Sequence, residues 1–142
     1  MPEKSIQETI GYLMVQVCKA HRNQACTILG NLGLYAGQEI LLMHLWENDG
    51  TIPSELASLM HVEAPTITKM LHRMEKAGLL ERRKDELDAR ICRIYLTDAG
   101  RSLREPVTRA WDLLEKQVLA NLTIEEQLLF RRLLLQVRDN LN

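Results

Sequence analysis

The stretch from Glu63 to Thr97 places a short amphipathic helix directly before a basic hairpin, and this order constrains the fold more than any other part of the chain. Four apolar residues recur at the helical spacing i, i+3, i+4 and i+7, namely Ile67, Met70, Leu71 and Met74. Pro65 fits the first turn of a helix, Glu63 is a candidate N-cap, and Gly78 suits a left-handed C-cap. The pattern predicts one helix between Glu63 and Gly78.

A two-stranded hairpin is predicted immediately after this helix. Residues 91–96 alternate between two sets of side chains: Cys92, Ile94 and Leu96 in one set, Ile91, Arg93 and Tyr95 in the other. A period of two is typical of a strand with one buried face. Residues 79–83 are the expected partner strand, and residues 84–89 form the loop.

A second short helix is predicted upstream, over residues 52–60. Its apolar positions are Leu56, Ala57, Leu59 and Met60, and His61 and Val62 then form a tight turn. Two short helices joined by a turn are typical of a helix-turn-helix, whose second helix enters the major groove of DNA. With the hairpin added, the sequence predicts a winged helix.

The predicted second helix is polar and cationic opposite its apolar stripe. That face carries Thr66, Thr68, Lys69, His72, Arg73 and Lys76, which are hydroxyl groups and cations suited to phosphates and base edges. Residues 64–84 contain six lysines and arginines and two acidic residues, whereas the whole chain has a formal net charge of −1. One basic patch on a near-neutral chain indicates a salt-sensitive DNA surface. For the helix alone, a solvated face is the alternative, and Arg73 could be an ion-pair partner.

Long helices are predicted on both sides of this region. The N-terminal one follows Ile6, Ile10, Leu13, Met14, Val17, Ile28 and Leu32, and a helix over residues 39–47 is apolar on most sides. Another long helix follows Gly100 through Leu103, Val107, Trp111, Leu114 and Val118. Residues 123–126 form a capping box that opens the last helix.

The last helix is apolar over more than half of its circumference. It contains Leu128, Leu129, Phe130, Leu133, Leu134, Leu135, Val137 and Leu141. Such a helix needs cover on two sides, and a small monomer offers one. The sequence predicts a dimer interface built from both termini, with burial inside the chain's own domain as the alternative.

Six motifs occur in an order that resembles the multiple-antibiotic-resistance regulator (MarR) family. They are Gly33-Leu-Tyr-Ala-Gly-Gln38, Glu55-Leu-Ala57, Pro65-Thr-Ile-Thr68, Arg73-Met-Glu-Lys-Ala-Gly-Leu79, Asp88-Ala-Arg90 and Leu96-Thr-Asp-Ala-Gly100. The resemblance implies a mostly α fold with a small β-hairpin wing: one domain over residues 1–142, a winged helix-turn-helix lobe at 35–100, and dimerisation helices at 1–34 and 101–142. It also implies a cytoplasmic transcription regulator, commonly a repressor, that binds near-palindromic double-stranded DNA as a homodimer.

The resemblance and the cationic face together give a set of expected DNA contacts. They are Ser54, Pro65, Thr66, Thr68, Lys69, His72, Arg73, Lys84, Asp88, Arg90 and Arg93. By the resemblance, Arg90 enters the minor groove or holds its phosphates, and Asp88 orients Arg90. A solvated turn is the alternative for this part of the wing.

The resemblance further implies an effector pocket between the dimer helices and the DNA-binding lobe, with a small phenolic or anionic ligand. Candidate lining residues are His21, Arg22, His44, Trp46 and Trp111. His44 and Trp46 could instead fill the core, and His21 and Arg22 could face solvent.

The three cysteines leave a redox-responsive regulator as an alternative. Peroxide-sensing members of the resembled family carry a cysteine early in the first helix, which here corresponds to a position near Gly11 rather than Cys18. Cys18 and Cys26 are eight residues apart on one predicted helix, about 12 Å and too far to bridge within a chain. Whether either of them, or Cys92, responds to oxidants is left open, and structural cysteines are favoured.

Composition and motifs argue against other classes of protein. The 142 residues are 26% charged and 46% hydrophobic, as expected of one soluble globular domain. No apolar run approaches the roughly 18 residues of a membrane span. The sequence lacks a phosphate-binding glycine loop, a nucleophile elbow and a paired metal motif, so we expect no enzyme, cofactor or metal site. A winged-helix module that binds proteins instead of DNA is the remaining alternative.

Overall fold

The computed structural model describes residues 3–142 and confirms a mostly helical chain with one small hairpin. In chain order the elements are the 3-10 helix η1 (Ile6–Glu8), α1 (Ile10–Gly30), α2 (Gln38–Glu47), α3 (Pro53–Met60), α4 (Ala64–Lys76), β1 (Leu80–Lys84), β2 (Cys92–Leu96), α5 (Asp98–Ser102), α6 (Arg104–Val118) and α7 (Ile124–Leu141).

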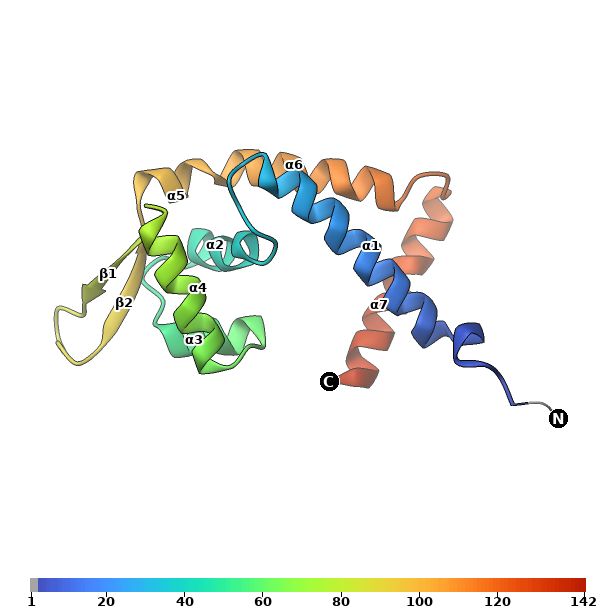
Figure 1. Cartoon of the computed structure of the whole chain (residues 1–142), viewed down its shortest axis with the longest axis horizontal. Coiled ribbons are helices and arrows are strands. Elements are labelled where there is room, and N and C mark those ends of the chain that lie inside the picture. The colour runs from blue at the N-terminus through green and yellow to red at the C-terminus, as the bar shows by residue number, and fades with distance from the viewer. Residues whose placement is uncertain (1–2) are drawn as a thin grey trace.

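The elements form two regions that α5 and α6 join along one edge of the molecule (Figure 1). The hairpin, α3 and α4 lie at one end, with α2 beside α4 and beneath α6, and we call residues 35–100 the winged-helix lobe. α1 and α7 lie on the other side, where α1 begins near the N-terminus at the far tip and α7 runs back to a C-terminus below the middle of the molecule in this view. The wing is therefore far from the terminal helices.

The core of the winged-helix lobe is built around α2. Leu41, Leu42 and Leu45 of α2 are 0% exposed, and so is Leu56 of α3. Ile67, Leu71 and Met74 of α4 and Ile94 of β2 are also buried in this cluster. Because a fully buried leucine stabilises a fold by about 1.5–3 kcal/mol, these contacts fix the position of α4.

The turn between α3 and α4 is tight because His61 adopts a left-handed conformation, with φ of 54°. α4 begins after Glu63, and Pro65 lies in its first turn as predicted. Glu63 occupies the N-cap position as predicted, although its side chain makes no capping hydrogen bond. Gly78 has φ of 77°, and the Leu79 amide donates to the Met74 carbonyl at 3.0 Å, which ends the helix.

The wing contains one more strand segment than the sequence predicts. β1 and β2 pair antiparallel in a register that sets Leu80 opposite Leu96, one residue later than the expected start of the hairpin. On the other side of β2, the Gly50 amide donates to the Ile94 carbonyl at 2.9 Å. The Ile94 amide donates to the Thr51 carbonyl at 3.1 Å. The wing is thus tied to the segment that follows α2.

Two predicted long helices are interrupted. Thr9 is extended, with φ of −82° and ψ of 150°, and its hydroxyl accepts from the Tyr12 amide at 3.1 Å, so α1 begins anew after η1. The helix expected after Gly100 is divided at Leu103 into α5 and α6. Gly100 itself is required by close packing, because a Cβ atom there would overlap the Leu79 carbonyl oxygen.

The terminal helices are covered very unevenly. The second half of α1 packs on α6, where Ala25, Leu29 and Leu114 are buried. α7 opens with the predicted capping box between Thr123 and Glu126, yet none of its residues, all described, is buried. The prediction of an apolar last helix is confirmed, and the alternative that it is sunk in its own domain is not.

Candidate nucleic-acid interface

α4 presents its polar side to solvent at the surface of the winged-helix lobe. Ile67, Leu71 and Met74 are buried, whereas the predicted DNA-facing side chains are exposed: Pro65, Thr66, Thr68, Lys69, His72 and Arg73. The Thr68 hydroxyl donates to the Ala64 carbonyl at 2.9 Å. Its proton is therefore used inside the helix, and the oxygen is left to accept a hydrogen bond from a base amino group.

Arg73 has no ion-pair partner within residues 3–142, although an ion pair was the alternative role for it. The nearby Glu75 instead pairs with Arg82 of β1, with 3.2 Å between Arg82 Nε and Glu75 Oε2. Arg73 and Lys69 thus keep their charge on the exposed face of α4, where a phosphate or a guanine could approach.

Asp88 and Arg90 are joined at the tip of the wing. Arg90 Nε and Nη2 donate to the two Asp88 carboxylate oxygens at 3.0 and 3.1 Å. This hydrogen bonding lowers the pKa of Asp88 and raises that of Arg90. The Arg90 side chain is nevertheless 90% exposed, so its remaining donors face outward. The geometry agrees with Asp88 orienting Arg90.

Arg93 points back into the protein rather than away from it. Its Nε donates to Asp85 Oδ1 at 2.7 Å and its Nη1 to the Gly50 carbonyl at 3.0 Å. Among the expected DNA contacts, Arg93 therefore has a guanidinium group committed to anchoring the wing. Ser54 and Lys84 are exposed, at the start of α3 and at the end of β1.

Asp85 is a residue whose role the sequence reasoning missed. Its carboxylate accepts from Arg93 and from the amides of Leu87 and Asp88, at 3.1 and 3.0 Å. The hydrogen bond from Arg93 is the main reason why the pKa of Asp85 is lowered. An aspartate whose side chain bonds to amides two and three residues ahead is typical of a tight turn, and this signal was available in the sequence.

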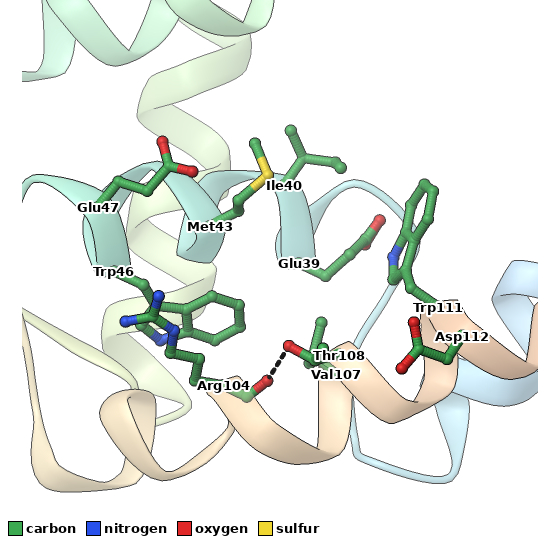
Figure 2. A pocket seen from close by; sticks show the side chains of 10 residues that line it. All are labelled: Glu39, Ile40, Met43, Trp46, Glu47, Arg104, Val107, Thr108, Trp111 and Asp112. Atoms are coloured by element: carbon green, nitrogen blue, oxygen red, sulfur yellow. Dashed lines mark hydrogen bonds between the residues drawn. The ribbon is translucent and has the colours of Figure 1, made fainter. Parts of the chain in front are cut away.

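A cavity of about 280 Å³ lies between α2 and α6, on the border between the two regions (Figure 2). Its lining consists of Glu39, Ile40, Met43, Trp46, Glu47, Arg104, Val107, Thr108, Trp111 and Asp112. Of the expected ligand residues, Trp46 and Trp111 line it. His21 packs on Trp111 with 5.7 Å between ring centroids. Arg22 and His44 are not part of the lining.

Glu39 is an acidic residue in the cavity wall that the sequence reasoning did not single out. It is 4% exposed, and its two carboxylate oxygens accept from the Gly37 amide at 3.0 and 3.1 Å. Burial raises the pKa of Glu39, opposed by these hydrogen bonds and by His21. The cavity-lining residues on α6 could have been recognised from their spacing, because residues 104, 107, 108, 111 and 112 share one helical face.

The thiols and the metal prediction add little to the site. Cys18 and Cys26 are exposed, Cys92 is partly exposed, and all three are free. Over residues 3–142, no three histidine, cysteine or acidic side chains come together as a metal site. In the same range, no helix has the length and apolarity needed to cross a membrane.

The fold and the exposed cationic helix define a winged-helix DNA-binding regulator, and comparisons agree. Residues 34–92 match the model of the MarR family. The chain is 32% identical over 128 residues to the HTH-type transcriptional repressor Rv2887 of Mycobacterium tuberculosis, covering 88% of this chain and 90% of the relative. The protein belongs to the MarR family of transcriptional regulators and is not an enzyme.

Solved structures share this fold over nearly the whole chain. A probable transcriptional regulator from Pseudomonas aeruginosa is 29% identical, with a TM-score of 0.84 over 94% of this chain and 99% of that one. MepR of S. aureus, solved with DNA, is 24% identical with a TM-score of 0.83, over 97% of this chain and 100% of that one, a likeness of fold.

Proposed function

We propose that the protein is a homodimeric repressor that binds near-palindromic operators and is controlled by a small ligand. The observation that carries the proposal is the separation of two incomplete surfaces. One end of the molecule presents the cationic face of α4 and the wing, and the other presents uncovered apolar side chains on α1 and α7.

The uncovered apolar side chains are too many for a solvated helix. On α7, Leu128 is 66% exposed, and Leu133 and Leu134 are each 47% exposed. Leu13 and Val17 on α1 are 54% and 53% exposed. So many exposed apolar side chains on two helices are typical of a protein–protein interface. A second copy of the chain supplies the same kind of surface and can cover both helices symmetrically.

A two-fold dimer sets the geometry of the DNA site. The two α4 helices would enter successive major grooves on one side of the duplex, about 34 Å apart. The expected contacts on α4 are Pro65, Thr66, Thr68, Lys69, His72 and Arg73, with Ser54 on α3. In the wing, Lys84 and Arg90 are the contacts and Asp88 orients Arg90. Because the two half-sites are related by symmetry, the operator is a near-palindrome.

The cavity between α2 and α6 is the proposed effector site. α2 forms the core of the winged-helix lobe, and α6 packs on α1 in the region assigned to the dimer. A ligand that favours one relative position of these helices changes the distance between the two α4 helices and hence DNA affinity. The M. tuberculosis relative is named a repressor, and we extend that role to this chain.

The proposal is tested with DNA flanking the chain's own gene. Fluorescence anisotropy at several salt concentrations should show binding that weakens steeply with salt, because the cationic face releases counterions. Sedimentation should show a dimer at the same protein concentration. Salt-independent binding, or a monomer that binds the full palindrome, would contradict the proposal and favour an interaction module that does not read DNA.

A further inference from the structure

We infer that the cavity between α2 and α6 takes a lipophilic cation, such as a protonated amine with an aromatic or alkyl body, rather than an anion. The inference rests on the proposed function, in which this cavity is the effector site. It concerns the chemistry of the ligand, for which the family resemblance led us to expect a phenol or an anion.

The charge of the lining opposes an anion. Three carboxylates line the cavity, from Glu39, Glu47 and Asp112, and Arg104 is the one cation among its lining residues in the described part of the chain. The remaining side chains are apolar or aromatic apart from Thr108. An anion inside this wall would meet more like charge than opposite charge.

The charges are also separated along the cavity. Figure 2 shows Glu39, Trp111 and Asp112 gathered toward one end and Trp46, Glu47 and Arg104 toward the other. The spacing along the helices agrees, since seven residues separate Arg104 from Trp111 on α6 and Glu39 from Trp46 on α2, a rise of about 10 Å. The end at Trp111 thus has two carboxylates and no arginine or lysine in its lining.

Glu39 is not paired with an arginine or a lysine in the described part of the chain, and His21 is the charged neighbour that lowers its pKa. Glu39 is nearly fully buried, and the hydrogen bonds that it accepts come from backbone amides, chiefly that of Gly37. A ligand ammonium group would supply the missing positive charge and offset the desolvation of the carboxylate. Asp112 on the facing helix would share the same cation.

Trp111 provides a second kind of contact for a cation. An indole ring attracts an ammonium group over its face through the ring quadrupole. His21 packs on Trp111 with an angle of 58° between the two rings, and this contact holds the indole in place. Ile40, Met43 and Val107 line the middle of the cavity, where the apolar body of the ligand would lie.

Three probes of nearly equal size separate the alternatives: phenylpropylammonium, phenylpropionate and phenylpropanol. The chain has two tryptophans, Trp46 and Trp111, and both line the cavity, so intrinsic tryptophan fluorescence reports binding without DNA. We expect the cation to bind at least about tenfold more tightly than the anion or the alcohol. Absence of cation binding, or tighter binding of phenylpropionate, would overturn the inference.

Charge-neutral variants locate the cation. Glu39→Gln and Asp112→Asn should each weaken phenylpropylammonium binding by about tenfold, and Arg104→Gln should leave it unchanged or strengthen it. Glu115→Gln is the matched control, because Glu115 is exposed on α6 outside the cavity and should have no effect. Circular dichroism checks that each variant folds. If Glu39→Gln does not fold, Asp112→Asn alone tests the assignment, because Asp112 is exposed. Equal effects of Asp112→Asn and Glu115→Gln would overturn the assignment.

A DNA measurement distinguishes this inference from the proposed function. Cation binding that leaves operator affinity unchanged supports the cavity assignment and contradicts ligand control of DNA binding. Release of the operator by phenylpropionate, abolished by Arg104→Gln, overturns the cation assignment while ligand control stands. Release by phenylpropylammonium, abolished by Asp112→Asn, supports both.

Discussion

The winged-helix lobe and the terminal helices differ in how completely the chain itself covers their apolar side chains. In the lobe, α2 has three leucines that are 0% exposed, and α4 buries Ile67, Leu71 and Met74 of its apolar stripe and covers Met70 in part. In α7, all of which is described, no residue is buried although the helix is rich in leucine. The apolar core of the lobe is covered within one chain, whereas the terminal helices leave apolar side chains exposed, which in our proposal a second copy covers. DNA binding and dimerisation are thus assigned to opposite ends of the molecule.

The largest expected effect comes from disrupting the proposed dimer interface on α7. Replacing Leu133 and Leu134 by aspartate would place unpaired charges in the proposed interface, where each costs several kcal/mol. We expect the dimer to dissociate and operator affinity to fall at least about a hundredfold, because the second half-site is no longer bound at high effective concentration. Sedimentation and anisotropy measure the two effects. Arg131→Gln and Arg132→Gln are exposed controls on the same helix, and an intact dimer in the double aspartate variant would refute the assignment.

The second effect separates two arginines of the wing. Arg90→Ala should weaken operator binding by about tenfold and reduce the salt dependence by about one counterion, with thermal stability nearly unchanged. Arg93→Ala should instead lower the thermal stability slightly, since it removes hydrogen bonds to Asp85 and Gly50. Anisotropy at two salt concentrations and thermal denaturation test the pair. Equal behaviour of the two variants would mean that the wing has been assigned wrongly.

A smaller effect is expected on the exposed face of α4. Lys69→Ala should lower affinity for operator and scrambled DNA alike by several-fold if it contacts phosphates, whereas Thr68→Ala should reduce discrimination between them if it contacts a base. Neither side chain belongs to the buried stripe, so helical content by circular dichroism should not change. Wild-type binding by both variants would show that this face does not meet DNA.

Local patterns explain which parts could be predicted from the sequence. The spacing from Ile67 to Met74 and the alternation around Ile94 are properties of neighbouring residues, and both elements form where expected. The helix end at Gly78 and the capping box at Thr123 likewise depend only on residues that are close in sequence. The division at Leu103 was not predicted, because the apolar spacing continues through it; the available signal was Pro106, which has no amide hydrogen to donate to the Ser102 carbonyl.

Tertiary contacts explain what the sequence did not reveal. Residues 48–51 lie between two predicted helices and were given no role, yet Gly50 and Thr51 form hydrogen bonds with Ile94, more than 40 residues distant in sequence. Arg93 alternates like a solvent-facing strand residue, and its inward direction depends on Asp85 and Gly50. The cavity exists because α2 packs near α6, which no local pattern of either helix specifies.

The smallest expected effect compares two glutamates whose pKa values are shifted in opposite directions. Burial raises the pKa of Glu39 in the lobe, whereas hydrogen bonds from Thr123 lower that of exposed Glu126 at the start of α7. When the pKa is raised in the folded state, the folded protein binds more protons than the unfolded chain. The contribution of Glu39 to stability is therefore greatest below the pKa of the unfolded state and declines as pH rises through the pKa of the folded state. For Glu126 the sign is reversed: the contribution is present above the unfolded pKa and is lost as pH falls through the lower folded value.

Chemical denaturation across the acid range tests both signs against neutral variants. The stability of the wild type relative to Glu39→Gln should decrease as pH rises above about 4.3, the ordinary pKa of glutamate. Relative to Glu126→Gln, the stability of the wild type should decrease as pH falls below that value. The difference in stability between the wild type and Glu39→Gln reports on the cavity region, which His21, Arg104 and Asp112 also face. A saturating cationic ligand should make this difference less dependent on pH, because it stabilises the carboxylate. A Glu39 difference that does not vary with pH would contradict the raised pKa and would mean that the hydrogen bonds and His21 offset the desolvation of the carboxylate.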